Sequence, residues 1–288
     1  MMIHPEVRSA LDAGQPVVAL ESNLFTHGLP RDINLDVARD LEAAIREGGA
    51  TPATIAVLNG QVTVGLTDDQ LVYLARTTNV RKCSQRDLPV VVGRGEDGGT
   101  TVAATMFIAH RVGIHIFATG GIGGVHRGNP FDISADLTEL GRIPIVVVCS
   151  GAKTILDLPL TLEVLETSGV PIIGYGTDEL PAFYTNTSGL PVDVRCDMPE
   201  DVADIVRAHD ALDLPGGLLV TVPVPSIHEL RATEAESAIG KALALAEARG
   251  IRGKALTPFL LDSVRELTSK ASQQANVDLL LNLSLIHI

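Results

Sequence analysis

The sequence has few cysteines, and their arrangement excludes two common ways of cross-linking a chain. Cys83, Cys149 and Cys196 are the three cysteines among 288 residues, and no C-x-x-C pair is present. An odd number at wide spacing argues against both a disulfide framework and a structural zinc site. A chain of this length with 45% hydrophobic residues can bury a large core without them. We therefore expect a protein that folds in a reducing compartment.

Long apolar runs are also missing. The longest runs have the length of a β-strand, well short of the roughly 20 residues that a membrane-spanning helix needs. The first residues, MMIHPEVRSALDAGQP, do not combine a basic start with an apolar segment as a secretion signal does. We expect a soluble, cytoplasmic protein without a membrane partner.

Positive charge is scarce. Lys and Arg number 22 against 35 Asp and Glu, which gives a formal net charge of −13. Nucleic-acid affinity comes mainly from lysine and arginine, so we expect a small-molecule substrate and no nucleic-acid partner. A phosphorylated substrate would need a few local cations and oriented backbone N–H groups. Lys82 and Arg86, just before the apolar run at residues 89–93, are two such cations, although locally they look like an ordinary solvated pair.

Short β-branched runs alternate with amphipathic segments along the chain. The runs predict strands at residues 16–20, 54–58, 89–93, 114–121, 143–151 and 218–225. Apolar residues at helical spacing predict helices at 35–48, 67–76, 100–111, 155–168, 199–208 and 233–249. This alternation predicts an α/β fold with three α/β/α layers and a central, largely parallel or mixed sheet. No repeat or low-complexity linker divides the chain, so we expect residues 1–288 to form a single domain.

The last residues, NLSLIHI, form an apolar end without a polar tail. Such an ending is unusual for an exposed terminus. It leads us to expect a truncated or altered C-terminal end.

The densest local signal is the glycine-rich segment FATGGIGGVHRG at residues 117–128. Glycines let backbone N–H groups approach an anion closely. The pattern is neither a Walker loop nor G-x-G-x-x-G followed by a helix, so it gives little support to a nucleotide site. Ligand binding and tight turns at a strand end explain these glycines equally well.

Oxygen-bearing side chains follow directly in FDISAD, residues 131–136. If this segment is extended, Asp132, Ser134 and Asp136 point to one side. Their oxygens would suit a hard cation such as Mg²⁺ or Mn²⁺, with water completing an octahedron. The alternative is a polar loop with an N-capping aspartate before ADLTEL.

Two further residues have the chemistry of a nucleophile and an acid. Lys153 follows a predicted strand in CSGAKTILDL, where Gly151 and Ala152 leave room around its amine. Desolvation favours the neutral amine that attacks a sugar aldehyde, although a solvated lysine at a helix start is the commoner case. Glu21 ends the strand in PVVALES at the edge where α/β sheets bind ligands, so it is either a general acid or an exposed loop carboxylate.

Taken together, these segments resemble the pseudouridine-5′-phosphate glycosidase family, also called the indigoidine synthase A-like family. The resemblance runs in order from about Val17 to Asn282 and is carried by ALES, THG, PATIAVLNG, KCSQRDLP, GGTTVAATM, FATGGIGGVHRG, FDISADL, CSGAKTILDLPLTLEVLETSGVPIIGY, LPAFY and KALTPFLL. So many ordered segments make chance similarity implausible. After Asn282 the family's polar C-terminal helix is replaced by LSLIHI.

The resemblance implies a role for individual residues. The family's nucleophilic lysine corresponds to Lys153, its proton-donating glutamate to Glu21 and its metal-binding aspartate to Asp132. Its substrate contacts correspond to Lys82, Val102, Thr119, His126, Ser134, Ala135, Asp136 and Asn276. The family uses one divalent metal per subunit, usually manganese, and forms a cytosolic homotrimer, so Mn²⁺ and a homotrimer are implied here.

The resemblance also implies a reaction, the reversible cleavage of pseudouridine 5′-phosphate to uracil and ribose 5-phosphate. In this hypothesis the ribose ring opens, Lys153 forms an imine at C1′, and the imine accepts electrons as the bond to uracil breaks. An ordinary N-glycosidase has paired carboxylates and would not need the lysine. Two alternatives stay open: an enzyme of the same fold that acts on another ribosyl phosphate, and a non-catalytic phosphosugar-binding protein, against which the intact Glu21 and Lys153 argue.

Overall fold

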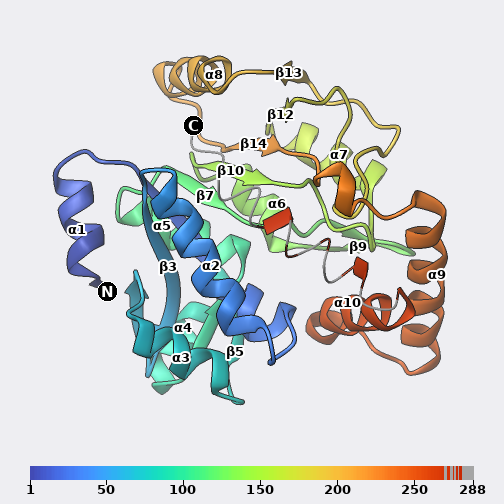
Figure 1. Ribbon diagram of the computed structural model, residues 1–288, viewed down its shortest axis with the longest axis horizontal. Helices are drawn as coiled ribbons and strands as arrows, with labels where there is room; N and C mark the ends of the chain where they lie inside the picture. Colours follow the sequence, from blue (N-terminus) through green and yellow to red (C-terminus); the bar gives the residue numbers. More distant parts are fainter. Residues whose placement is uncertain (269–270, 273–274, 276, 278, 281–288) are drawn as a thin grey trace.

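A computed structural model describes residues 1–268, 271–272, 275, 277 and 279–280 and shows a mixed β-sheet with helices on both faces (Figure 1). The strands are β1 (Met2–Ile3), β2 (Val17–Glu21), β3 (Thr51–Leu58), β4 (Gln61–Val64), β5 (Arg81–Cys83), β6 (Gly98–Thr100), β7 (Ile116–Ala118), β8 (Val125–His126), β9 (Asn129–Ile133), β10 (Val146–Cys149), β11 (Leu156–Asp157), β12 (Ile172–Tyr175), β13 (Val194–Cys196) and β14 (Leu218–Thr221). The α-helices are α1 (Pro5–Asp12), α2 (Asn34–Glu47), α3 (Asp68–Arg76), α4 (Leu88–Arg94), α5 (Val102–Arg111), α6 (Ala135–Leu140), α7 (Leu158–Thr167), α8 (Pro199–Ala211), α9 (Ala232–Ala248) and α10 (Leu256–Leu267). Short helical turns are η1 (Leu24–Gly28), η2 (Gln85–Asp87), η3 (Ser226–His228) and η4 (Gly253–Ala255).

The large sheet has the strand order β1-β4-β3-β2-β7-β10-β14-β12-β13, with β6 and β5 branching from β3. Most neighbours are parallel, and only the pairs of β3 with β4 and with β6 are antiparallel within the described sheet. A second, small antiparallel sheet has the order β11-β8-β9. The prediction of an α/β fold with a largely parallel or mixed central sheet is therefore confirmed.

Strand β2 shows why both faces of the sheet need helices. Its side chains alternate in direction: Val17 and Ala19 join a core cluster that contains residues of α5, whereas Val18 and Leu20 join a second cluster with residues of α2. All four side chains are buried. In Figure 1, α2 passes in front of the sheet. This gives the three-layer arrangement that continuous apolar strands require.

Most predicted elements are present, but the strand predicted at residues 89–93 is wrong, because these residues lie in α4. Valines favour strands, yet Pro89 occupies the first turn of the helix, where its missing N–H costs nothing. Gly95 then ends the helix with φ of 66°, a left-handed conformation that glycine adopts easily. Lys82 and Arg86 consequently precede a helix and not a strand.

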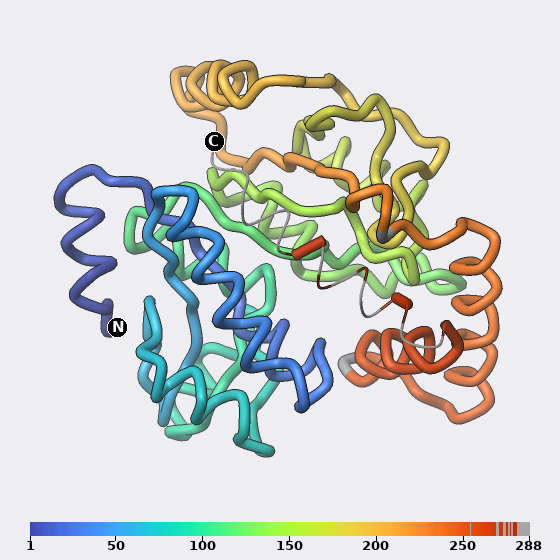
Figure 2. Tube along the Cα trace, viewed as in Figure 1, coloured from blue at the N-terminus to red at the C-terminus, as the bar shows by residue number. Residues whose placement is uncertain are grey.

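The first helix and the helices α9 and α10 lie on opposite sides of the molecule. Figure 2 shows α1, in blue, at one side and the contacting helices α9 and α10, in orange and red, at the other. We call α9, η4 and α10 the C-terminal arm. No helix within the described residues is long and apolar enough to cross a membrane. The predictions about Asn276 and about the altered end beyond Asn282 lie outside the described residues.

Candidate active site

A cavity of about 460 Å³ lies where several strands of the large sheet end. Residues that follow β2, β7 and β10 line it, which is the edge at which parallel α/β sheets bind ligands. The structure brings together in its wall ten of the eleven site residues predicted from the sequence, namely Glu21, Lys82, Val102, Thr119, His126, Asp132, Ser134, Ala135, Asp136 and Lys153. The eleventh, Asn276, lies outside the described residues.

Glu21 is the last residue of β2 and is 8% exposed. Thr119, which follows the neighbouring strand β7, donates a hydrogen bond of 2.6 Å from Oγ1 to Glu21 Oε1. Burial raises the pKa of the Glu21 carboxyl, and the charge of Lys153 and the Thr119 hydrogen bond oppose that rise. A carboxyl group with a raised pKa keeps its proton to higher pH and can act as a general acid.

Lys153 lies in the loop between β10 and β11, with its amine directed at the glycine-rich loop. Its Nζ donates to the Gly121 carbonyl oxygen at 2.5 Å. The backbone of Lys153 is fixed as well: its N–H donates to Ile122 O at 3.2 Å, and its carbonyl accepts from Leu156 N at 2.9 Å. Among the charged groups around Glu21, Lys153 has the largest influence on the glutamate's pKa. The amine and the carboxyl are therefore close enough to act on one ligand in the cavity.

The segment FDISAD is only partly extended. Strand β9 ends at Ile133, Ser134 caps α6 by accepting a hydrogen bond from Asp136 N at 3.2 Å, and Asp136 itself lies in the helix. Asp132 and Asp136 therefore do not follow the alternation of one strand. The predicted N-cap is present, but it is a serine and not an aspartate.

Asp136 connects three parts of the cavity wall. Its Oδ1 accepts from Ala103 N of α5 at 2.9 Å, and its Oδ2 accepts from Gly123 N of the glycine-rich loop at 2.8 Å. The residue is 7% exposed. A Cβ added at Gly123 would overlap Ser134 and Asp136, and one added at Gly124 would overlap Thr161. The loop glycines thus allow Ser134, Asp136 and Thr161 to pack directly against the loop backbone. The two hydrogen bonds of Asp136 hold the loop and α5 together.

Asp132 and His126 face the cavity from the small sheet, on β9 and β8. The Asp132 carboxylate makes no hydrogen bond or ion pair with the described residues, and the buried Nδ1 of His126 also has no partner among them. Burial lowers the pKa of His126, and the charge of Asp132 opposes this change. Within the described chain there is no group of three His, Cys, Asp or Glu residues that could hold a metal. Any divalent cation here would keep most of its water, as Mg²⁺-type sites with one or two carboxylates do.

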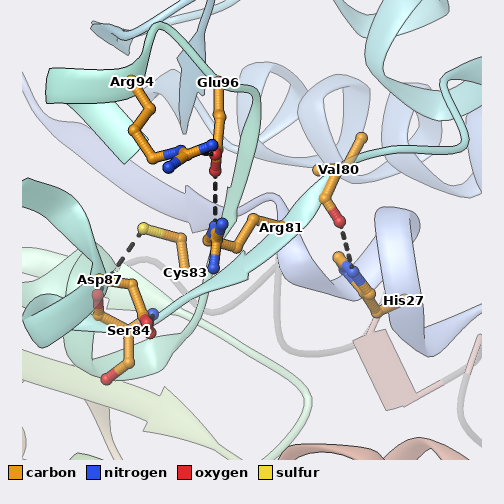
Figure 3. Close-up of polar contacts among 8 residues, drawn as sticks. All are labelled: His27, Val80, Arg81, Cys83, Ser84, Asp87, Arg94 and Glu96. Carbon is orange, nitrogen blue, oxygen red and sulfur yellow. Dashed lines mark hydrogen bonds and ion pairs between the residues drawn. The ribbon is translucent and has the colours of Figure 1, made fainter. Parts of the chain in front are cut away.

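Lys82 reaches the cavity from β5, a short strand that is fixed on its other side. Arg81 Nε donates to Glu96 at 2.7 Å, and His27 Nε2 donates to the Val80 carbonyl at 3.0 Å (Figure 3). Since side chains alternate along a strand, Lys82 points away from Arg81. Lys82 lines the cavity together with Val102, the first residue of α5. The positive end of that helix and the lysine are both suited to an anion.

Three polar residues of the cavity wall that were not predicted from the sequence have a buried atom without a hydrogen-bond partner in the described part of the chain. These atoms are Asn23 Oδ1, Ser84 Oγ and Thr101 Oγ1. A buried polar atom without a partner is costly, which indicates a ligand or water as its natural partner. Ser84 and Thr101 do lie in the segments KCSQRDLP and GGTTVAATM, and Asn23 follows ALES by one residue. Proximity to those segments is the one signal that could have identified them.

The C-terminal arm completes the cavity. Gly253, Thr257, Pro258 and Leu261 contribute to its wall. Phe183 adds an aromatic ring next to Gly121, the residue whose carbonyl receives the Lys153 amine. Its φ of 61° is unusual for a bulky residue and costs about 1–3 kcal/mol, a strain that typically persists where function requires it. The site thus combines an amine, a buried acid, an anion-binding end and an enclosing wall, which suits covalent chemistry on a phosphorylated sugar.

Comparison with known proteins identifies relatives along nearly the whole chain. Residues 6–285 match the family model described as indigoidine synthase A like protein. A pseudouridine-5′-phosphate glycosidase of Methylobacterium nodulans is 54% identical over 280 residues, which cover 96% of this chain and 83% of that protein. A protein of the same name from Herpetosiphon aurantiacus is 53% identical, and the match covers 98% of this chain and 94% of the relative.

Two solved structures share the fold. The crystal structure of an indigoidine synthase A-like protein from Thermotoga maritima has a TM-score of 0.88 and 36% identity, covering 94% of this chain and 90% of that one. The prealnumycin C-glycosynthase AlnA, solved in complex with ribulose 5-phosphate, has a TM-score of 0.90 and 40% identity, covering 98% and 93% of the two chains.

Proposed function

The chain belongs to the indigoidine synthase A-like family, and from this membership we propose that it catalyses the reversible cleavage of pseudouridine 5′-phosphate to uracil and ribose 5-phosphate. It is an enzyme, because relatives that share about half of its residues along nearly the whole chain are enzymes. The observation that carries the proposal is the convergence of Lys153, buried Glu21 and Lys82 on one cavity of about 460 Å³. An amine, an acid and a cation are the three groups that this reaction needs from the protein.

The lysine and the glutamate divide the covalent chemistry between them. As the C1′–O4′ bond of the ribose breaks, the Lys153 amine bonds to C1′ and Glu21 gives its proton to O4′. When C5 of uracil takes up a proton, the lone pair of the lysine nitrogen forms a C1′=N bond and the C1′–C5 bond breaks. Water then hydrolyses the imine, which releases ribose 5-phosphate and regenerates the amine. Burial raises the pKa of Glu21, which favours the protonated carboxyl that the first step needs.

The phosphate of the substrate belongs at the α5 end of the cavity. Lys82 and the first turn of α5, beginning with Val102, supply positive charge and backbone N–H groups there. Thr101 Oγ1 and Ser84 Oγ, which are buried without a partner in the described residues, add hydroxyl groups to the same wall. In a chain of net charge −13, such local donors are what allow a dianion to bind.

We also propose one divalent cation, Mn²⁺, with Asp132 as its protein carboxylate. The carboxylate makes no hydrogen bond with the described residues, and its charge acts on His126, whose Nδ1 has no hydrogen-bond partner among them, so these donor atoms are available. A bound cation would order water and polarise the base near that wall. Chelation should lower turnover, and Mn²⁺ should restore it better than Ca²⁺, because Ca²⁺ prefers longer bonds and more ligands. Full activity of Asp132→Ala in chelator would remove the metal from this proposal.

The decisive experiment traps the covalent intermediate. Purified enzyme is incubated with ribose 5-phosphate and borohydride, digested, and analysed by mass spectrometry for a reduced adduct. We expect the adduct on Lys153 and, in a parallel assay, release of uracil from pseudouridine 5′-phosphate. Lys153→Ala should lose both, and Lys153→Arg should lose both as well, because a guanidinium stays protonated. The unphosphorylated nucleoside should be a much poorer substrate.

Other results would contradict the proposal. An adduct on a different lysine, or normal turnover by Lys153→Ala, would exclude the mechanism. Equal use of the unphosphorylated nucleoside would exclude the phosphate site at Lys82. Binding of ribose 5-phosphate without adduct or turnover would leave a phosphosugar-binding protein.

A second candidate is the synthesis of another C-ribosyl compound. It is favoured by the 40% identity to prealnumycin C-glycosynthase AlnA, whose structure contains ribulose 5-phosphate. The identity of 54% to a pseudouridine-5′-phosphate glycosidase favours the first candidate. A panel of aromatic acceptors offered with ribose 5-phosphate separates the two, since each function predicts a different preferred acceptor.

Finally, we propose a homotrimer in the cytoplasm. All three cysteines are buried and form no disulfide, which agrees with a reducing compartment. Light scattering on the eluting protein should give three times the 30.3 kDa mass of the chain. A monomeric mass would contradict the trimer and leave the chemistry of the cavity untouched.

A further inference from the structure

Arg127 connects three segments that are far apart in the sequence. It follows β8 at the end of the glycine-rich loop, and its Nε donates to Leu156 O at 2.9 Å while Nη2 donates to Thr154 O at 2.8 Å. The same guanidinium forms a bidentate ion pair with Glu236 of α9, with both N–O distances 2.8 Å. Five N–H groups in a rigid plane can make these bonds at once, and a lysine cannot.

The bonds of Arg127 hold the loop that carries Lys153. Thr154 and Leu156, whose carbonyls accept from Arg127, lie one and three residues after the lysine. Leu156 N in turn donates to the Lys153 carbonyl, so the backbone N–H and C=O of Leu156 together connect the lysine backbone to the arginine. On the far side, the Thr154 hydroxyl donates to Ala182 O. The loop is thereby fixed from two directions.

Arg127 is not itself placed to touch the substrate. It does not line the cavity, although its neighbour His126 does. Its side chain is 28% exposed, and its pKa is raised by the hydrogen bonds with Glu236, so it stays charged. The pKa of Glu236 is lowered by the same bonds. Both pKa shifts favour the ion pair. Any effect of Arg127 on the reaction must pass through the backbone carbonyls that it binds.

We propose that Arg127 is a positioning residue for Lys153 and that Glu236 ties this positioning to the C-terminal arm. The proposal rests on the proposed function, because it assigns Lys153 as the nucleophile. Loss of the guanidinium frees the carbonyls of Thr154 and Leu156, and the amine then samples positions away from C1′. Misplacement of a reacting group by about 1 Å costs on the order of 100-fold in rate. Phosphate binding at Lys82, with which Arg127 forms no hydrogen bond, should be unaffected.

The test compares the rate of imine trapping with substrate affinity in matched variants. Arg127→Gln, Arg127→Lys, Glu236→Gln and the control Arg39→Gln are assayed for borohydride trapping at saturating ribose 5-phosphate, for kcat and KM, and for Tm. Arg39 makes a comparable bidentate pair with Asp68, with both distances 2.7 Å, at the surface of α2 and away from the cavity. Exposed fractions are similar in the two pairs, 28% and 54% against 43% and 61%.

We expect Arg127→Gln to lower kcat and the trapping rate by about 10- to 100-fold while KM changes less than about threefold. Arg127→Lys should have a higher kcat and trapping rate than Arg127→Gln. Glu236→Gln should lower both rates less than Arg127→Gln does, and Arg39→Gln should match the native enzyme. If Arg127→Gln does not fold, Arg127→Lys and Glu236→Gln still report the same split between kcat and KM.

Each result separates this proposal from the proposed function. A native enzyme that forms no adduct on Lys153 would overturn the function itself. A native adduct together with Arg127 variants that trap and turn over like Arg39→Gln would overturn the positioning role. A fall in Tm with unchanged kcat would make Arg127 a purely structural residue, and a rise in KM at constant kcat would make it a substrate contact; both results contradict the proposal.

Discussion

At the scale of single residues, Glu21 shows a conflict between stability and chemistry. Its burial raises its pKa above the value in the unfolded chain, so folding favours the protonated form. The resulting stability is complete below the unfolded pKa, about 4.3, and is lost as pH rises through the raised folded value. At neutral pH the protein therefore carries a destabilising carboxyl group that a purely structural position would not contain.

We predict that Glu21→Gln stabilises the fold at neutral and alkaline pH and has no such effect near pH 4. Each kcal/mol gained should raise Tm by about 2–4 °C. The same variant should lose about 100-fold or more in kcat, because a glutamine has no proton to give. Thermal melts across the pH range, with turnover measured alongside, test both statements.

Asp68→Asn provides a control in which the change in stability at neutral pH has the opposite sign. Its hydrogen bond with Arg39 lowers the pKa of Asp68, so the native carboxylate stabilises the fold above its unfolded pKa. This variant should lose, and not gain, stability at neutral pH. A Glu21→Gln protein less stable than the native one at pH 8 would contradict the assignment of Glu21 as a desolvated acid.

The residues with obvious chemistry could be predicted from the sequence, and the supporting ones could not. Glu21 and Lys153 follow strands, and strand ends meet in an α/β sheet. Asn23 looks like any loop residue until its burial without a partner is seen. The partner of Arg127 lies 109 positions further along the chain, at Glu236, and no local pattern predicts that contact.

At the scale of elements, apolar periodicity predicted helices and strands well where length and pattern agreed. It failed at residues 89–93, where a short run of valines fits either element and the flanking Pro89 and Gly95 decide for a helix. It also could not show that FDISAD changes from strand to helix at Ser134. A helix cap depends on a single residue, whereas an alternating polar and apolar pattern can be recognised only over several residues.

Asp136 gives a prediction about elements, since it joins α6 to α5 and to the glycine-rich loop. Asp136→Asn replaces one acceptor oxygen by an NH₂ group that faces a backbone N–H. The free energy of unfolding should fall by about 3 kcal/mol, because hydrogen bonds to a charged group contribute about 1.5–3 kcal/mol each. Denaturant unfolding measures the change, with Ser134→Ala, which removes only a helix cap, expected near 1 kcal/mol.

This prediction also tests the substrate contact that the family resemblance implies at Asp136. At a temperature where the variant is folded, its KM should change less than that of Lys82→Ala. A native-like stability combined with a large rise in KM would show that Asp136 serves the substrate and not the packing of the wall.

At the scale of the whole molecule, the order of elements predicts the sheet and its two helical layers, because alternating strands and helices form few architectures. The same order does not predict where the C-terminal arm lies. The arm has no strand of its own to place it, and its position over the cavity depends on contacts such as Arg127 with Glu236.

The arm should respond to the ligand as a unit. Since Gly253, Thr257, Pro258 and Leu261 line the cavity, bound ribose 5-phosphate should slow hydrogen exchange in α10. With ligand at 100 times its Kd, amides that exchange by opening of the arm should slow by up to about 100-fold, equivalent to 2.7 kcal/mol. Peptides from α8, which contributes nothing to the described cavity wall, serve as the control. Equal protection of α8 and α10 would indicate global stabilisation instead of a closing arm.

The close approach at Gly124 constrains how the gene can change. Every first- or second-base substitution in a glycine codon that leaves an amino acid adds a Cβ, and here the added carbon meets Thr161. Thr161 also accepts a hydrogen bond from the buried Val125 N–H, so removing its hydroxyl destabilises the loop by about 1–3 kcal/mol. Neither change is favourable alone, yet in the pair Gly124→Ala with Thr161→Ala the two closest contacts, to Oγ1 and Cγ2 of Thr161, are gone. Selection for revertants of a Gly124→Ala strain should therefore recover, besides true reversion, second-site suppressors at codon 161.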